Sequence, residues 1–139
     1  MANDDVSEAI AARALAQIGV AFKLHGRKAG AGLDCVGLTA HAMDVQHDLP
    51  CPPRDYHMAG DYIDQICTYM EKCGFGFAAP DAPLQVGDII LLRPGPRQQH
   101  LGIWTGAGLV HAHAGIRRVV FTPGQPVWPV CQIWRKKGD

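Results

Sequence analysis

The spacing of apolar residues changes at about residue 83, and this change constrains the fold more than any other feature of the chain. Before it, apolar residues recur at helical spacing; after it, short apolar segments alternate with turns, as in antiparallel strands. The predicted helices run from a cap at Asp4 or Asp5 to about Gln17, over residues 35–45 and over residues 60–72. The predicted strands span residues 86–93, 100–105, 109–114, 117–121 and 130–134. Helices followed by strands predict an α+β fold in which N-terminal helices pack on a C-terminal antiparallel β-sheet.

Length and charge limit what such a chain does. Its 139 residues are enough for one substantial core, so we expect a single domain over residues 1–139. Lys and Arg together number 13, as do Asp and Glu, which gives no electrostatic basis for binding nucleic acid. No stretch approaches the roughly 18 apolar residues of a membrane span, and the N-terminus lacks the pattern of a secretory signal. We therefore expect a protein that is made in the cytoplasm and binds neither nucleic acid nor membranes.

The cysteines give the first indication of chemistry. Their odd number, irregular spacing and lack of a CxxC pair argue against a disulfide framework and a structural zinc site. Cys51, Cys67, Cys73 and Cys131 are expected to be small core residues. Cys35 differs because it stands where a glycine-containing loop meets a predicted helix start. An ordinary thiol has a pKa near about 8.5, and a helix N-terminus or a nearby imidazolium lowers that pKa toward the reactive thiolate.

The neighbours of Cys35 fit a nucleophile but do not identify one. Asp34 precedes it as a possible helix cap, and Gly37 is expected to leave room for a substrate backbone. Backbone N–H groups at the helix start are donors for the oxyanion of a tetrahedral intermediate.

Histidines on two neighbouring predicted strands supply the second half of the pattern. His100 opens one strand, and His111 and His113 share a face of the next. A cysteine nucleophile needs a base, and the base needs an orienting group. With an ideal two-residue turn at residues 106–107, His113 would lie directly across from His100 and His111 diagonally. Convergence of Cys35, His100 and His111 on zinc is an alternative that the residues leave open.

Four ordered motifs make the chain resemble the NlpC/P60 family of cell-wall cysteine peptidases. They are LDCVGL at residues 33–38, GDIILL at 87–92, HLGIWTG at 100–106 and LVHA at 109–112. The family pattern is a D-C-S-G-L helix start, a G-D strand, H-x-G-I-Y and a later I-H-A. The resemblance implies a papain-like α+β fold and cleavage of the bond between D-γ-glutamyl and a diamino acid in peptidoglycan stem peptides.

Carried over residue by residue, the resemblance implies Cys35 as nucleophile, His100 as base and His111 as the residue that orients the base, with His113 in reserve. Asp34 would help to bind the amino end of the stem peptide, unless its role is the helix cap. It implies no cofactor and no metal. Phe22 falls near the place of a family tyrosine, so a hydroxyl at the oxyanion site is missing.

Two further features resemble a subgroup of small wall peptidases from phages and gene-transfer particles. Val36 replaces the usual serine, and residues 127–129 form a Val-Trp-Pro segment near the end. The similarity implies phage-tail-like partners and action at the cell wall without an export signal. Two other hypotheses are a thiol amidase or acyltransferase with another substrate, and a non-catalytic tail component with the same fold.

Overall fold

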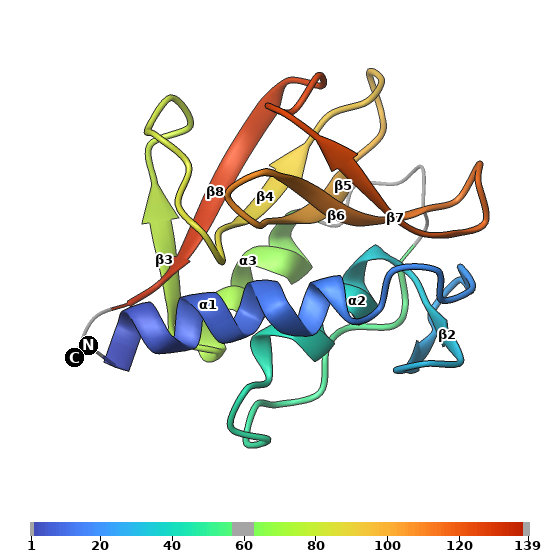
Figure 1. The fold of residues 1–139 in the computed structure, drawn as a ribbon, viewed down its shortest axis with the longest axis horizontal. Coiled ribbons are helices and arrows are strands. Elements are labelled where there is room, and N and C mark those ends of the chain that lie inside the picture. Colours follow the sequence, from blue (N-terminus) through green and yellow to red (C-terminus); the bar gives the residue numbers. More distant parts are fainter. Residues whose placement is uncertain (1, 57–62, 138–139) are drawn as a thin grey trace.

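The computed structural model describes residues 2–56 and 63–137 (Figure 1). Its helices are α1 (Ala2–Leu15), α2 (Cys35–Met43) and α3 (Ile63–Lys72). Its strands are β1 (Arg27–Lys28), β2 (Gly32–Leu33), β3 (Phe75–Ala78), β4 (Ile89–Leu92), β5 (His100–Trp104), β6 (Gly108–His113), β7 (Arg118–Pro123) and β8 (Val130–Lys136). None of the helices within residues 2–56 and 63–137 has the length and apolar character needed to cross a membrane.

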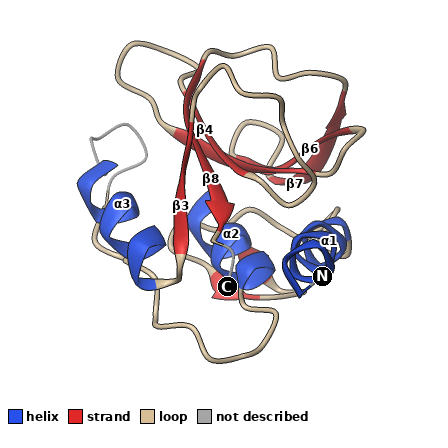
Figure 2. Cartoon of the chain, turned by 90° about the vertical axis from the view of Figure 1, so that its left-hand side faces the viewer, coloured by secondary structure: helices blue, strands red, loops and turns tan. Residues whose placement is uncertain are grey.

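A six-stranded antiparallel sheet forms the centre of the molecule, in the order β3-β8-β4-β5-β6-β7. Helices α1 and α2 lie along one side of this sheet and α3 lies beside β3 (Figure 2). Strands β1 and β2 form a separate antiparallel pair just before α2. The predicted α+β fold is therefore confirmed.

Alternating side chains divide the core between the two faces of the sheet. In β4, Ile89 and Leu91 belong to the main core with the helices, whereas Ile90 and Leu92 belong to a smaller cluster. Successive strand residues point to opposite faces, so the smaller cluster lies on the face away from the helices. Trp128, from the loop between β7 and β8, packs onto this second cluster.

The five predicted strands are confirmed with shifted ends, but β3 was not predicted. Its sequence, residues 75–78, is short and carries a glycine between two phenylalanines, so its alternation is too brief to recognise. The predicted cap at Asp4 or Asp5 is wrong, because α1 begins at Ala2 and both residues lie inside it. Helix α1 also ends at Leu15, two residues before the predicted end. Of the third predicted helix, residues 60–62 lie outside the described residues.

Candidate active site

Cys35 is the first residue of α2, and Asp34 caps that helix. The Asp34 backbone is extended, and its Oδ1 accepts a hydrogen bond from the Gly37 N–H at 2.8 Å. This bond satisfies one of the N–H groups that a helix start leaves without an intrahelical partner. The cap role proposed for Asp34 is therefore confirmed. Cys35 is buried, and α2 packs against β5 and β6.

The Asp34 carboxylate is also the centre of a buried polar cluster. Its Oδ1 accepts a second bond from Arg27 Nη1 at 3.0 Å, and its Oδ2 accepts from the His25 N–H at 2.8 Å and from the Tyr56 hydroxyl. Burial and the Asp34 carboxylate raise the pKa of Tyr56, so its hydroxyl remains a donor. Four donors from the chain itself thus occupy the two oxygens of Asp34.

Arg27 extends the cluster to a third segment. Its Nη2 donates to the Tyr56 hydroxyl at 2.8 Å and to the Pro53 carbonyl, and its Nη1 also donates to the Gly26 carbonyl at 2.9 Å. The Arg27 side chain is only 10% exposed and that of Asp34 is fully buried, so the ion pair is shielded from water. We call Arg27, Asp34 and Tyr56 the clamp, because they tie residues 25–27 and 53–56 to the start of α2.

The space beside Gly37 is filled by the chain itself. A Cβ atom at this position would lie 2.0 Å from the carbonyl oxygen of Gly26. A glycine is required here because the loop before α2 passes this close to the helix. The expected room for a substrate backbone at Gly37 is therefore taken by residue 26.

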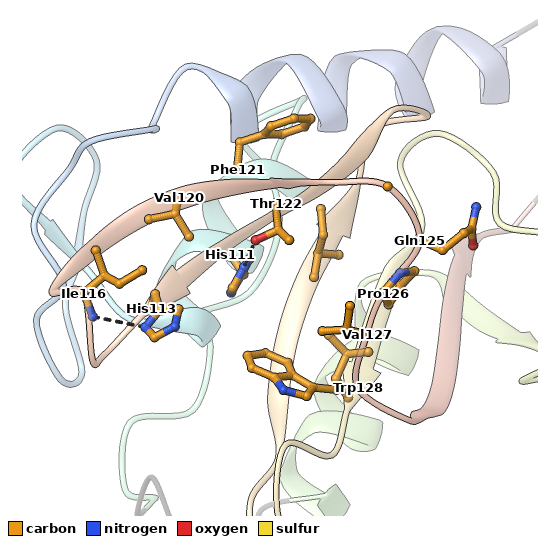
Figure 3. Close-up of a pocket in the computed structure, with 13 residues that line it drawn as sticks. His111, His113, Ile116, Val120, Phe121, Thr122, Gln125, Pro126, Val127 and Trp128 are labelled. Atoms are coloured by element: carbon orange, nitrogen blue, oxygen red, sulfur yellow. Dashed lines mark hydrogen bonds between the residues drawn. The ribbon is translucent and has the colours of Figure 1, made fainter.

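His100 and His111 are joined directly. A hydrogen bond of 2.8 Å connects His100 Nε2 with His111 Nδ1, and one of 2.9 Å connects His111 Nε2 with Thr122 Oγ1. Figure 3 shows His111 between Thr122 on β7 and the ring of Trp128. Both histidines are buried.

Strand alternation explains where the pair lies. Leu101 in β5 and Val110 and Ala112 in β6 belong to the main core, so His100 and His111 point to the other face of the sheet. There the indole of Trp128 meets both imidazoles nearly at right angles, with ring centroids at 5.6 Å and 5.9 Å.

Burial keeps both imidazoles neutral near neutral pH. Burial and the neighbouring His111 and His113 lower the pKa of His100 to about 3, and burial and His113 lower that of His111 to about 4. A neutral imidazole carries one N–H, so the order of hydrogen bonds selects the tautomer. If His100 Nε2–H donates to His111 and His111 Nε2–H donates to Thr122, then His100 Nδ1 is an unprotonated acceptor. This tautomer suits a general base.

His113 has a different partner. The β5–β6 pairs Ile103↔Val110 and Trp104↔Leu109 have the register of the predicted two-residue turn. The hydrogen-bonded pair is nevertheless the diagonal one, His100 with His111. His113 Nδ1 instead accepts from the Ile116 N–H at 3.1 Å, which fixes its ring in the turn after β6.

Phe22 lies beside the segment that leads into α2. It forms a parallel bridge with Leu33, its N–H donates to the Arg117 carbonyl at 2.9 Å, and its half-buried ring packs on the main core. No hydroxyl is available from this side chain. Sequence reasoning missed Arg27, Tyr56 and Thr122 as partners of the candidate residues, since no short-range motif connects them.

The zinc alternative gains no support from the geometry. Within the part of the chain that the structure describes, no group of three or more His, Cys, Asp or Glu side chains is arranged to hold a metal ion.

A cysteine at a helix start, beside strands that carry a hydrogen-bonded histidine pair, is the arrangement of papain-like cysteine peptidases. Comparison with protein families agrees with this class. Residues 19–128 match the model of the NlpC/P60 family, and the chain belongs to that family. It is 26% identical over 111 residues to the murein DD-endopeptidase MepS/murein LD-carboxypeptidase of Escherichia coli K12. The match covers 79% of this chain and 51% of that protein, so the chain spans about half the length of the curated relatives it matches.

Solved structures show the same fold at low sequence identity. NlpC1 from Trichomonas vaginalis superposes with a TM-score of 0.66 at 22% identity, over 98% of this chain and 46% of that one. The peptidoglycan hydrolase RipB from Mycobacterium tuberculosis superposes with a TM-score of 0.62 at 24% identity, over 96% and 65% of the two chains. A P60 domain from M. avium subspecies paratuberculosis gives a TM-score of 0.62 at 21% identity, over 98% and 97%.

Proposed function

We propose that this protein is a cysteine hydrolase that cuts peptide bonds in peptidoglycan, with residues 1–139 acting as one catalytic domain. The observation that carries the proposal is the 2.8 Å bond between His100 and His111, on strands against which the Cys35 helix packs. Membership of the NlpC/P60 family supports it. The printed names of the E. coli and M. tuberculosis relatives, a murein endopeptidase and a peptidoglycan hydrolase, support the substrate class.

The proposed mechanism requires the Cys35 thiol to reach His100 at the end of the sheet, where Cys35 is the first residue of α2 and His100 is the first residue of β5, the strand against which α2 packs. His100 Nδ1 then takes the proton of the thiol as the sulfur attacks the scissile carbonyl. The His100 Nε2–H remains donated to His111, which keeps the ring in place and shares the positive charge as it forms. Collapse of the tetrahedral intermediate breaks the C–N bond, and His100 returns the proton to the leaving amine. Water then hydrolyses the acyl-enzyme by the same base. Because Phe22 brings no hydroxyl, the oxyanion must rely on backbone N–H groups at the start of α2.

The finer substrate assignment is part of the proposal. The scissile bond predicted from the family motifs is that between D-γ-glutamyl and a diamino acid. Asp34 is proposed to act mainly by holding the start of α2, since four donors of the chain already occupy its carboxylate. Association with a phage-tail-like particle stays a prediction from Val36 and residues 127–129. Detection of the protein in purified particles would test it.

The test is digestion of purified murein and of a defined stem tetrapeptide by wild type and by Cys35→Ala, with products identified by mass spectrometry. We expect cleavage at the γ-glutamyl bond by wild type only. Thiol-dependent cleavage at another amide bond would instead support the amidase hypothesis. No cleavage by folded wild type, together with a Cys35 that iodoacetamide does not alkylate at neutral pH, would refute the hydrolase and favour a structural component.

A further inference from the structure

A cavity of about 400 Å³ adjoins the histidine pair on the sheet face away from the helices (Figure 3). Strands β6 and β7 and the loop that carries Trp128 enclose it. Its apolar walls include Leu109, Val120 and Val127. This volume lies within the range of small-molecule sites, which is roughly 300–1,000 Å³. A second cavity of about 280 Å³ holds His100, and Trp128 lines both.

Neither cavity offers a charge. None of the residues described as lining them is Asp, Glu, Lys or Arg. The side-chain polar groups of the larger cavity are those of His111, His113, Thr122, Gln125 and the indole N–H of Trp128, and His111 and Thr122 are already hydrogen bonded to each other. A charged ligand group would lose its hydration here without gaining a partner of opposite charge, so an uncharged group is favoured.

Large apolar side chains at the rim of the larger cavity are exposed to solvent. Val127 is 82% exposed and Ile116 is 53% exposed. Apolar side chains clustered around a concavity gain by being covered, which marks ligand sites on protein surfaces. The apolar walls, the exposed apolar side chains at the rim and the absence of charged residues in the described lining therefore all favour an uncharged, apolar ligand.

We propose that this cavity is a binding subsite for an uncharged apolar group, an alkyl chain or an aromatic ring, carried by the molecule whose amide bond is cut. The inference rests on the proposed function, because His111 both lines the cavity and is hydrogen bonded to the proposed base. A γ-glutamyl–diamino acid segment carries charged groups, which would lose their hydration against these apolar walls. That segment is therefore not the expected occupant of the cavity. The subsite thus adds an apolar requirement to the substrate beyond the scissile bond.

Binding is measured with N-phenyl-1-naphthylamine, an uncharged probe that fluoresces in apolar surroundings. Val120→Trp places bulk in the cavity, and Val127→Asp places a charge at its rim. The matched control is Ile18→Asp, which removes an apolar side chain that is 45% exposed and lines neither cavity. We expect saturable binding by wild type, binding weakened at least about tenfold in both cavity variants, and no change in the control.

Competition defines the chemistry of the occupant. Three amides of the same chain length are compared as displacers of the probe: hexanamide, its analogue ending in a carboxylate (adipamic acid) and its analogue ending in an ammonium (6-aminohexanamide). We expect hexanamide to displace the probe at a concentration at least about tenfold below either charged analogue. Hexanamide should also inhibit murein cleavage competitively, raising KM and leaving kcat unchanged.

The outcomes separate this proposal from the proposed function. Probe binding by a folded wild type that cleaves no murein would uphold the cavity as a ligand site and refute the hydrolase. If both proposals hold, Cys35→Ala should lose cleavage and keep probe binding. The subsite is overturned by absent or unsaturable binding, by equal weakening in Ile18→Asp, or by equal displacement by the charged amides. Hexanamide that binds without inhibiting an active enzyme would refute the placement of the cavity in the substrate site.

Discussion

Replacing Asp34 with alanine removes two interactions at once. It deletes the cap of α2, and it leaves the guanidinium of Arg27 in the interior without its counter-charge. Loss of an N-cap side chain costs about 1 kcal/mol, and a buried charge left without its partner costs about 3–5 kcal/mol. We therefore expect Asp34→Ala to lower the free energy of unfolding by about 4–6 kcal/mol. That is a large share of the roughly 5–15 kcal/mol that stabilises a typical domain.

Urea unfolding, followed by circular dichroism, measures this loss. The double variant Asp34→Ala/Arg27→Met should be more stable than Asp34→Ala alone, because no buried cation then lacks a partner. The matched control is Asp48→Ala, an exposed carboxylate, which should change the free energy of unfolding by less than about 0.5 kcal/mol.

An Asp34→Ala variant as stable as the control would refute a stabilising role for the clamp. So would a second substitution at Arg27 that lowers stability further, by the amount that Arg27→Met costs alone. That additivity would mean that the two side chains do not stabilise each other, whatever their 3.0 Å separation.

Three other predictions follow from the same geometry. Because burial lowers the pKa values of His100 and His111 to about 3 and 4, the unfolded chain binds more protons than the folded one below pH about 6.5. Stability should therefore be unaffected by these groups above that pH and should fall between pH about 6.5 and 4 by about 1.4 kcal/mol per pH unit for each histidine; a His100→Asn/His111→Asn variant with an unchanged acid slope would contradict this. Gly37→Ala should cost about 3 kcal/mol or more, because its Cβ would lie 2.0 Å from the Gly26 carbonyl oxygen; a thermal melt like that of wild type would show that the loop yields freely. His111→Ala should lower kcat by about 10²–10⁴-fold, and His113→Ala should have a much smaller effect; the reverse order would identify His113 as the orienting residue.

Local patterns were sufficient for much of the fold and for the main candidate residues. The period of the apolar residues located the strands from β4 to β8, and the loop-to-helix junction placed Cys35 at a helix start. Each of these features depends on residues close in the sequence. The two-residue turn even predicted the observed register of β5 with β6.

Contacts between distant residues could not be predicted in the same way. Tyr56 reaches Asp34 across 22 positions, and nothing near Tyr56 in the sequence indicates a buried partner. The choice between His111 and His113 depends on whether the His100 ring is hydrogen bonded to the residue directly across from it or to the diagonal one. Strand pairing alone does not determine this. The family motif, and not the strand geometry, predicts the diagonal contact.

The neutral state of the histidine pair connects its mechanism with the cavity beside it. With pKa values of about 3 and 4, neither ring carries the second proton of an imidazolium in the resting protein at neutral pH, so a preformed thiolate–imidazolium pair is not expected. Proton transfer from the thiol must then accompany the attack on the substrate. Trp128 helps to keep the two imidazoles neutral, because its indole packs against both rings. An apolar group bound against Trp128 would exclude further water and hold His111 neutral, whereas a charged group would have to be desolvated beside it. Burial of the histidine pair therefore lowers the stability of the folded protein in acid. The same burial makes the adjoining cavity suited to an uncharged part of the substrate.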